Sequence, residues 1–187
     1  MSYADSFSDG NNTRNTLAYP TTVTDPDGYS ATTKYHFDFA AITYTRTPQP
    51  NTTSNLPGPE QTFTFDAIGR LQQQTELVNG AYTRFEYPAS ANRLDTYTTI
   101  QDGLSEAHSF QITDGAGRVI ATATDHPGSI GGFSAQRTIY DTMGRAIKFS
   151  NPTETSASGI PSQWTTAGDD AAAGWVYTQQ TYDWKGR

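Results

Sequence analysis

The sequence predicts an all-β chain, built as an array of β-hairpins that forms a curved or spiralling antiparallel sheet. Two observations predict this fold. A short motif, aromatic-Asp-x-x-Gly-Arg-apolar, recurs along the 187 residues, and its spacing of roughly 25 residues is typical of repeat arrays. The segments between the motifs alternate Thr with aromatic residues, which favours strands. Strands should therefore far exceed helices, and the one stretch with helical character, Asp169 to Ala173, is too short to be stable alone.

Four copies of the motif are clear, and they share Asp, Gly and Arg at the same three positions. They comprise Asp66, Gly69 and Arg70; Asp114, Gly117 and Arg118; Asp141, Gly144 and Arg145; and Asp183, Gly186 and Arg187. Asp and Gly at this spacing suit a type I turn, in which the Asp side chain accepts a backbone N–H and the Gly takes a positive φ. Such a turn closes a β-hairpin that carries a bulge. We predict a positive φ at Gly69, Gly117 and Gly144.

The residues beside each turn follow from hairpin geometry. Positions one and three before the Asp share a sheet face, and they are occupied by Phe63 with Phe65, Thr138 with Tyr140, and Gln180 with Tyr182. The Arg stands where its guanidinium can reach the Asp or lie over an aromatic ring, which Lys does less well. A structural turn accounts for every position of the motif. The functional alternative is that the four Asp-Arg pairs form ligand sites.

Two weaker copies fill the gaps in the register. Tyr35-His36-Phe37-Asp38 keeps the first half of the motif, and Tyr87-Pro88 with Asn92-Arg93-Leu94 after it keeps both halves imperfectly. Asn92 would replace the Gly, because Asn tolerates a positive φ. Another turn is expected at Asp25-Pro26-Asp27-Gly28-Tyr29, which resembles a calcium loop but has His36 where the twelfth position needs a carboxylate.

The domain organisation predicted from this register is a single array over residues 1–187. Its N-terminal part, 1–46, is degenerate, and the clearer repeats occupy 61–187. A long loop rich in Ser, Thr, Gly and Ala is expected at 151–174, with further loops at 47–60 and 125–133.

The repeated Tyr-Asp-x-x-Gly-Arg signature resembles the YD repeats of rearrangement-hot-spot (Rhs) proteins and of the related teneurins. The resemblance covers most of residues 20–187. It implies hairpins that coil into a spiralling β-sheet shell, which in bacterial toxins encloses a C-terminal effector. The Rhs self-cleaving core has Leu where this chain has Tyr29, so cleavage chemistry is not carried over.

The composition is typical of a β-sheet that has one face exposed to water. Only 34% of residues are hydrophobic, yet the chain has 11 Tyr, 9 Phe and 3 Trp, and these amphipathic rings can line a sheet with one face in water. The absence of Cys excludes disulfides and thiolate metal sites. A net charge of −7 without basic clusters argues against a nucleic-acid surface. No apolar run is long enough to cross a membrane as a helix, so we expect no membrane insertion.

Catalysis has no positive support in the sequence. The three histidines, His36, His108 and His126, share no ligand or triad spacing and are expected to be solvent-facing or hydrogen-bonded. Paired carboxylates for glycoside hydrolysis could come from Glu60, Glu76, Glu86 or Glu106, but nothing selects a pair. We expect no enzyme activity and no cofactor or metal.

The sequence therefore predicts a structural module, a shell or stalk segment of a secreted or surface-attached bacterial Rhs-type protein. Its partners would be other repeats of a longer parent chain. One alternative is an extracellular fibre subunit, a homopolymer joined head-to-tail when the N-terminal Ser2 to Phe7 of one copy pairs with the C-terminal edge of the next. A second alternative is a module that binds a glycan or a protein through exposed aromatics such as Trp164, Trp175 and Trp184.

Overall fold

The structure is a computed structural model that describes residues 1–3, 7–8, 13–14, 18–36, 38, 40–48, 58–89, 92–101, 105–157 and 159–186. Over these residues the chain is all-β, with one antiparallel sheet of 14 strands, and its only helices are two short 3-10 turns. The prediction of an all-β, antiparallel fold is confirmed. No helix in the described part is long and apolar enough to span a membrane.

The strands follow one another along the chain, and most of them are hydrogen-bonded to the strand that comes next. The strands of the main sheet are β3 (Thr22–Thr24), β4 (Ser30–Tyr35), β5 (Ile42–Arg46), β6 (Glu60–Phe65), β7 (Leu71–Glu76), β8 (Tyr82–Glu86), β9 (Arg93–Gln101), β10 (Ser105–Thr113), β11 (Val119–Asp125), β12 (Phe133–Tyr140), β13 (Ala146–Ser150), β14 (Thr153–Ser156), β15 (Thr165–Thr166) and β16 (Tyr177–Gln179). A separate two-stranded sheet pairs β1 (Phe7–Ser8) with β2 (Thr13–Arg14).

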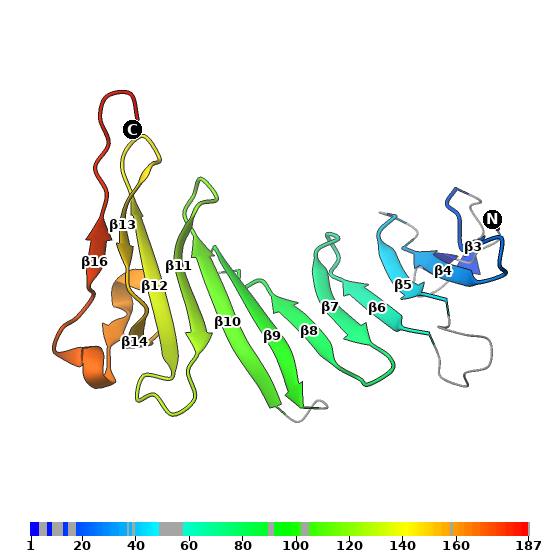
Figure 1. Cartoon of the computed structure of the whole chain (residues 1–187), viewed down its shortest axis with the longest axis horizontal. Helices are drawn as coiled ribbons and strands as arrows, with labels where there is room; N and C mark the ends of the chain where they lie inside the picture. The colour runs from blue at the N-terminus through cyan, green and yellow to red at the C-terminus, as the bar shows by residue number, and fades with distance from the viewer. Residues whose placement is uncertain are drawn as a thin grey trace. The chain divides into compact units, whose positions relative to one another are not determined.

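The chain divides into two compact units. The first consists of Met1–Phe85 with Thr98–Glu106, and the second of Glu86–Tyr97 with Ala107–Arg187. Strands β8, β9 and β10 give residues to both. In the first unit β3 to β7 form successive antiparallel pairs. In the second unit β10, β11, β12 and β13 do the same, as Figure 1 shows, and β12 also pairs with β14.

The predicted bulge occurs in each hairpin that the clear motif closes. The strand after the turn has one extra residue, so the register shifts between Thr64 and Phe65, between Ile112 and Thr113, and between Ile139 and Tyr140. Because a bulge turns one more side chain toward the face of its neighbours, Ile120 joins the residues that pack against the core.

The core of the second unit lies on one face of β10 to β12. Cross-strand partners Phe110, Ala123 and Ala135 form one row of it, and each is at most 3% exposed. Small Ala side chains on two strands leave space for the large rings of Phe110 and Trp164, which meet edge to face at 5.6 Å between centroids. Such pairs add to the stabilisation that burial alone provides.

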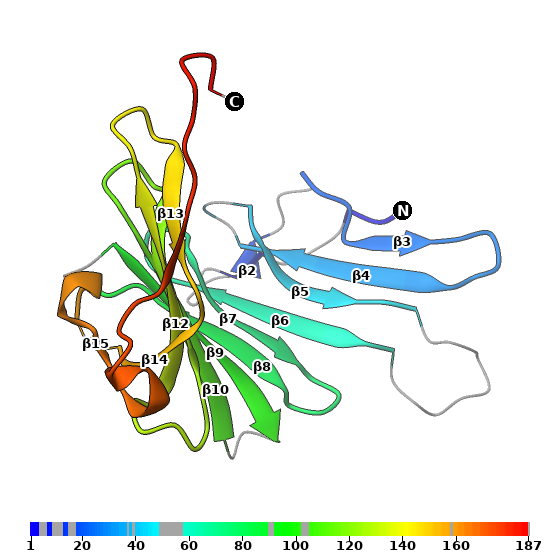
Figure 2. The same ribbon diagram turned by 60° about the vertical axis from the view of Figure 1, so that its left-hand side comes forward.

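The prediction of a plain loop at 151–174 is wrong. This segment contains β14, β15 and two 3-10 helices, η1 (Pro161–Gln163) and η2 (Gly168–Ala171), and in Figure 2 it lies, in orange, beside β12. The sequence did not indicate these strands because β14 and β15 are only four and two residues long. They form through pairing of β14 with β12 and with β15. The predicted loop at 125–133 lies between β11 and β12. Of the loop at 47–60, residues 49–57 lie outside the described part.

The weaker motif copy at Asp38 lies in the hairpin of β4 and β5, which has a bulge like the clear copies, but the described hydrogen bonds of its turn differ from theirs. Here His36 N–H donates to the Ala41 carbonyl and Ala40 takes the positive φ, 54°. The reason is that no Gly follows Asp38 at the required spacing. The turn before Asn92 includes residues 90 and 91, which the structure does not describe.

A fifth turn of the motif type occurs where the sequence suggested a plain turn. Asp25 Oδ1 accepts the N–H of Tyr29, and Gly28 has φ +89°. Its N–H bonds the Asp25 carbonyl at 3.1 Å. This copy departs from the motif at one position, because Tyr29 stands in the place of Arg.

Candidate functional site

The Asp-x-x-Gly-Arg turn has the same hydrogen bonds in the three copies that are fully described. In the copy at Asp141, one carboxylate oxygen accepts the N–H groups of Met143 and Arg145 at 2.9 and 2.8 Å. The other oxygen accepts Arg145 Nε–H at 2.7 Å. The copies at Asp66 and Asp114 repeat these contacts. The predicted positive φ at Gly69, Gly117 and Gly144 is confirmed, with values of 83°, 79° and 82°.

These contacts favour the ionised carboxylate. The side-chain hydrogen bond from Arg118 holds the pKa of Asp114 below its ordinary value, and the backbone hydrogen bond from Arg145 does the same for Asp141. At Asp66 desolvation alone would raise the pKa, but hydrogen bonds from Arg70 outweigh it and the pKa is lowered. Hydrogen bonds to the charged form have this effect because protonation would break them.

In two of the turns the Arg also contacts the Tyr of the following repeat. The guanidinium of Arg118 lies 4.6 Å from the ring centroid of Tyr140, and that of Arg145 lies 4.7 Å from the ring of Tyr182. The two alternatives left open for the Arg, a contact to Asp or to a ring, are therefore both present at once.

The hydroxyl of the same Tyr completes the junction. Tyr140 donates to the Val119 carbonyl at 3.0 Å, and Tyr182 donates to the Ala146 carbonyl at 2.9 Å. In both cases the acceptor directly follows the Arg under the ring. One motif therefore fixes its own turn and binds the next repeat. In the last copy Gly186 has φ +78° and its N–H bonds the Asp183 carbonyl at 3.0 Å, whereas Arg187 lies outside the described residues.

A second candidate site is a charged cluster that was not among the predicted sites. Asp95 on β9 is buried, with 2% of its surface exposed. Arg93 Nε–H donates to one oxygen of this carboxylate at 2.7 Å, and Arg93 also contacts the other oxygen. His108 Nε2 lies 2.6 Å from Asp95 Oδ1. Burial would raise the pKa of Asp95, but the hydrogen bonds from Arg93 and His108 outweigh it, so the pKa is lowered.

Aromatic rings hold both His108 and Arg93 in place. The rings of His108 and Tyr97 stack at 4.3 Å with an interplanar angle of 6°, and Arg93 lies 3.6 Å from the centroid of Phe110. Since an ionised carboxylate can only accept, His108 must carry a proton on Nε2. In the part of the chain that the structure describes, no hydrogen bond reaches Nδ1 of His108, so no nucleophile is paired with it there.

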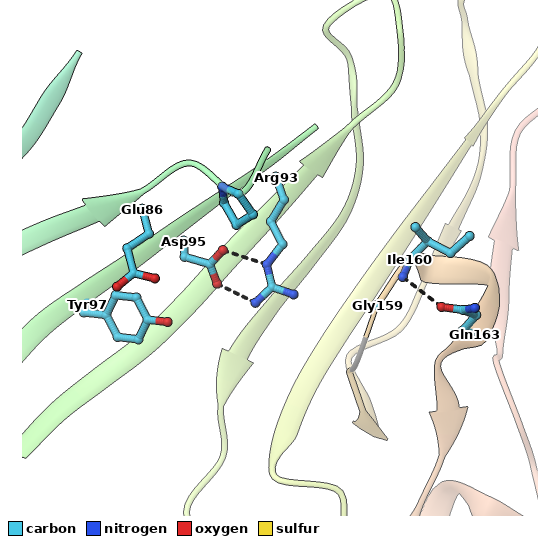
Figure 3. A pocket seen from close by; sticks show the side chains of 8 residues that line it. Glu86, Arg93, Asp95, Tyr97, Gly159, Ile160 and Gln163 are labelled. Atoms are coloured by element: carbon cyan, nitrogen blue, oxygen red, sulfur yellow. Dashed lines mark hydrogen bonds and ion pairs between the residues drawn. The ribbon is translucent and has the colours of Figure 1, made fainter. Parts of the chain in front are cut away.

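A cavity of about 390 Å³ lies beside the cluster. Figure 3 shows Arg93 and Asp95 on one side of it, next to Glu86 and Tyr97, with Gly159, Ile160 and Gln163 on the other. Its volume falls within the range of about 300–1,000 Å³ that small-molecule sites occupy. However, the carboxylate of Asp95 already accepts from Arg93 and His108, so it is neither a free acid nor a free base.

The other predicted candidates are dispersed. Among the carboxylates, Glu106 accepts from Arg84 at 2.7 and 2.8 Å, Glu60 lies 3.4 Å from Arg46, and Glu76 contacts Gln61. No group of three or more His, Cys, Asp or Glu side chains suited to a metal occurs within the described ranges.

The three tryptophans do not form the exposed platform expected for a glycan. Trp164 is buried in the core at 4% exposure and Trp175 packs against that core, while Trp184 is 88% exposed. The description of Trp164 as exposed is therefore wrong. Its position follows from the segment 151–174, called the insert below, which places Trp164 against Phe110.

The cluster at Asp95 was missed, although the sequence carries a signal. Arg93, Asp95 and Tyr97 alternate along one strand, and Asp is depleted from strand interiors. A charged pair on the inward face of a strand indicates a partner on the neighbouring strand, which is His108.

No protein-family model and no curated protein matches this chain.

Proposed function

We propose that this chain is a non-enzymatic structural module, a shell or stalk segment of a secreted or surface-attached bacterial protein of Rhs type. Its repeats would join those of a longer parent chain. The observation that carries the proposal is the junction in which the Arg of one repeat lies under the Tyr of the next. The polar side chains that define the motif are thereby used to bind repeats together.

The geometry of the motif supports a scaffold over a ligand site. The guanidinium of Arg118 donates a hydrogen bond to Asp114 at 2.8 Å and lies over the ring of Tyr140. That of Arg145 makes the same two contacts with Asp141 and Tyr182. An Asp-Arg pair that binds ligands would need one of these partners to be released. The non-enzymatic part of the proposal is supported by the engagement of Asp95 with Arg93 and His108.

A fibre subunit is the second candidate, favoured by the edge at β16. In the described part of the chain β16 pairs with β13 alone, and the turn at Asp183 has the hydrogen bond that starts the return strand of other hairpins. A strand of a second copy would fit this edge. The N-terminal strand first considered for it is partly engaged in its own chain, because Ser2 bridges to Thr22 and β1 pairs with β2.

The experiment that tests the scaffold is to express the full gene product that contains residues 1–187 and to image it by electron microscopy. We expect the flanking sequence to continue the motif and the particles to be shells or stalks in which this segment is part of the wall. A product without further repeats that forms small isolated particles would refute the scaffold. Filaments formed by residues 1–187 alone would favour the fibre instead.

A further inference from the structure

A second cavity in the second unit has a volume of about 580 Å³. Its wall is largely apolar and includes one arginine side chain. Ile112, Ile120, Ile160 and Pro161 line the apolar part, and Arg137 supplies the cation. Ile112 belongs to the core, the bulge brings in Ile120, and η1 begins at Pro161. This combination of apolar walls with few polar groups is characteristic of small-molecule sites, which occupy about 300–1,000 Å³.

Arg137 occupies a position where the sheet would otherwise continue its core. Ile112 pairs with Ala121, and Ala121 pairs with Arg137, so the three side chains form a row on one face. The neighbouring row is Phe110, Ala123 and Ala135, which are all buried and apolar. The strand thus places an arginine where the pattern calls for a hydrophobic residue.

The guanidinium of Arg137 has no acceptor among the residues that the structure describes. It lies 5.1 Å from the ring centroid of Trp175, which positions it. No hydrogen bond or ion pair from its side chain is formed with any residue that the structure describes. Its backbone N–H donates to Ser150 Oγ at 2.8 Å. This differs from Arg93, Arg118 and Arg145, which each hold a carboxylate.

The carboxylate of Asp114, which lines a neighbouring cavity with Arg137, is bound by another arginine. A smaller cavity of about 280 Å³ shares Ile120, Arg137 and Pro161 with the first and reaches Asp114. Asp114 is bound by Arg118 within its own turn, and its charge is balanced there. The five N–H donors of Arg137 are thus available to a ligand.

We propose that the cavity beside Arg137 binds a small carboxylic acid with a branched aliphatic or aromatic group. The carboxylate pairs with the guanidinium, whose planar fork matches two oxygens. The hydrocarbon group packs against Ile112, Ile120, Ile160 and Pro161. The C-terminal Leu of a peptide and a free short-chain acid share this chemistry. The site does not depend on the proposed scaffold role.

The test is titration calorimetry, with two-dimensional NMR of the isoleucine methyl groups, on the intact chain. The probes are N-acetyl-L-leucine, which mimics a peptide C-terminus, 4-methylpentanoate, which is a free acid, and N-acetyl-L-leucine amide, which lacks the charge. Both acids should bind and shift the Ile112, Ile120 and Ile160 signals, and the amide should bind at least about tenfold more weakly. Tighter binding of N-acetyl-L-leucine than of 4-methylpentanoate supports a peptide source, and the reverse supports a free acid.

Matched variants test whether the guanidinium of Arg137 binds the carboxylate of the ligand. Arg137→Gln should weaken binding of both acids at least about tenfold and leave the weak binding of the amide unchanged. Lys148→Gln removes an equal charge from the adjacent strand β13 and should leave the affinity unchanged. Equal binding of acid and amide by the natural chain would overturn the proposal without recourse to a variant. So would undiminished binding by Arg137→Gln, or no binding of any probe at millimolar concentration.

Discussion

The guanidinium of Arg118 lies 4.6 Å from the ring centroid of Tyr140, and the hydroxyl of that Tyr donates to the carbonyl of Val119, the residue after the Arg. The same relationship joins Arg145 to Tyr182 and Ala146. The Tyr therefore contacts the turn of the previous repeat through both its ring and its hydroxyl. This explains why a Tyr stands before Asp141 and Asp183, and why Arg follows the Gly in the turns at Asp114 and Asp141.

Tyr140→Phe tests the hydroxyl of this junction alone. The ring and its contact with Arg118 remain, but the hydrogen bond to Val119 is lost, so the free energy of unfolding should fall by about 1 kcal/mol. Urea denaturation measures the change. Tyr177→Phe is the matched control, because no hydrogen bond of its hydroxyl occurs in the described part of the chain. Equal stability of Tyr140→Phe and the natural chain would contradict the junction.

Substitution of the turn glycines separates backbone strain from side-chain crowding. Gly117 and Gly144 have nearly the same φ, but a Cβ at Gly117 meets nothing within 4 Å, whereas a Cβ at Gly144 lies 2.8 Å from Arg118 Nη1. Gly117→Ala should therefore lose on the order of 1 kcal/mol from strain. Gly144→Ala should lose more, since Arg118 must move, and Gly144→Val more still.

Thermal and urea melts check the order of these variants. Gly115→Ala is the control, because Gly115 has neither a positive φ nor a neighbour within 4 Å of an added Cβ. Its stability should be unchanged or slightly higher. An unchanged melt for Gly144→Val would show that the hairpin assignment is wrong there.

Asp95→Asn should destabilise the second unit by about 3 kcal/mol or more. The substitution keeps the shape but leaves the half-buried Arg93 without its counter-charge, and the loss of one partner of a buried pair costs on this scale. Urea denaturation is the measurement. Asp27→Asn at an exposed turn removes the same charge and should change stability by less than about 0.5 kcal/mol. Similar small effects for both would mean that the cluster is not a stabilising element.

Stability should decrease in acid. The pKa of Asp95 is lowered by folding from its ordinary value of 3.8, so the stabilisation it provides is complete above that value. It is lost as the pH falls through the lower pKa of the folded state. The lowered pKa values of Asp66, Asp114 and Asp141 act in the same direction. Urea melts between pH 7 and pH 2 should show this loss, and Asp95→Asn should reduce its slope; a slope equal to that of the natural chain would exclude Asp95 as a source.

Gln179→Pro tests strand addition at β16. Gln180 N–H bonds Ile147 and the carbonyl of Val176 accepts from Asn151, so by alternation the N–H of Gln179 points away from β13. Proline there removes a donor from the free edge while β13 pairing remains. If the chain forms fibres, light scattering should show polymers for the natural chain and for Gln179→Ala, but not for Gln179→Pro. A natural chain that stays monomeric at high concentration would exclude the fibre.

Local chemistry within a few residues was predictable. The Asp-x-x-Gly-Arg motif determines its own turn, because the carboxylate, the backbone N–H groups that it accepts and the Gly with positive φ lie within five residues. The turns, the bulges and the strands beside them were therefore expected from the sequence. The same locality explains the failures, since Asp38 lacks the following Gly and the short strands of the insert lack any local signal.

What the sequence by itself determined is the all-β class and the position of each motif turn. Only the tertiary structure decided which side chains meet across strands. Asp95 and His108 are 13 residues apart, Arg118 and Tyr140 are 22 apart, and Trp164 reaches Phe110 from the insert. The physical reason is that strand pairing and register set these contacts. A shift of one residue would turn Arg137 away from the cavity and place its neighbours there.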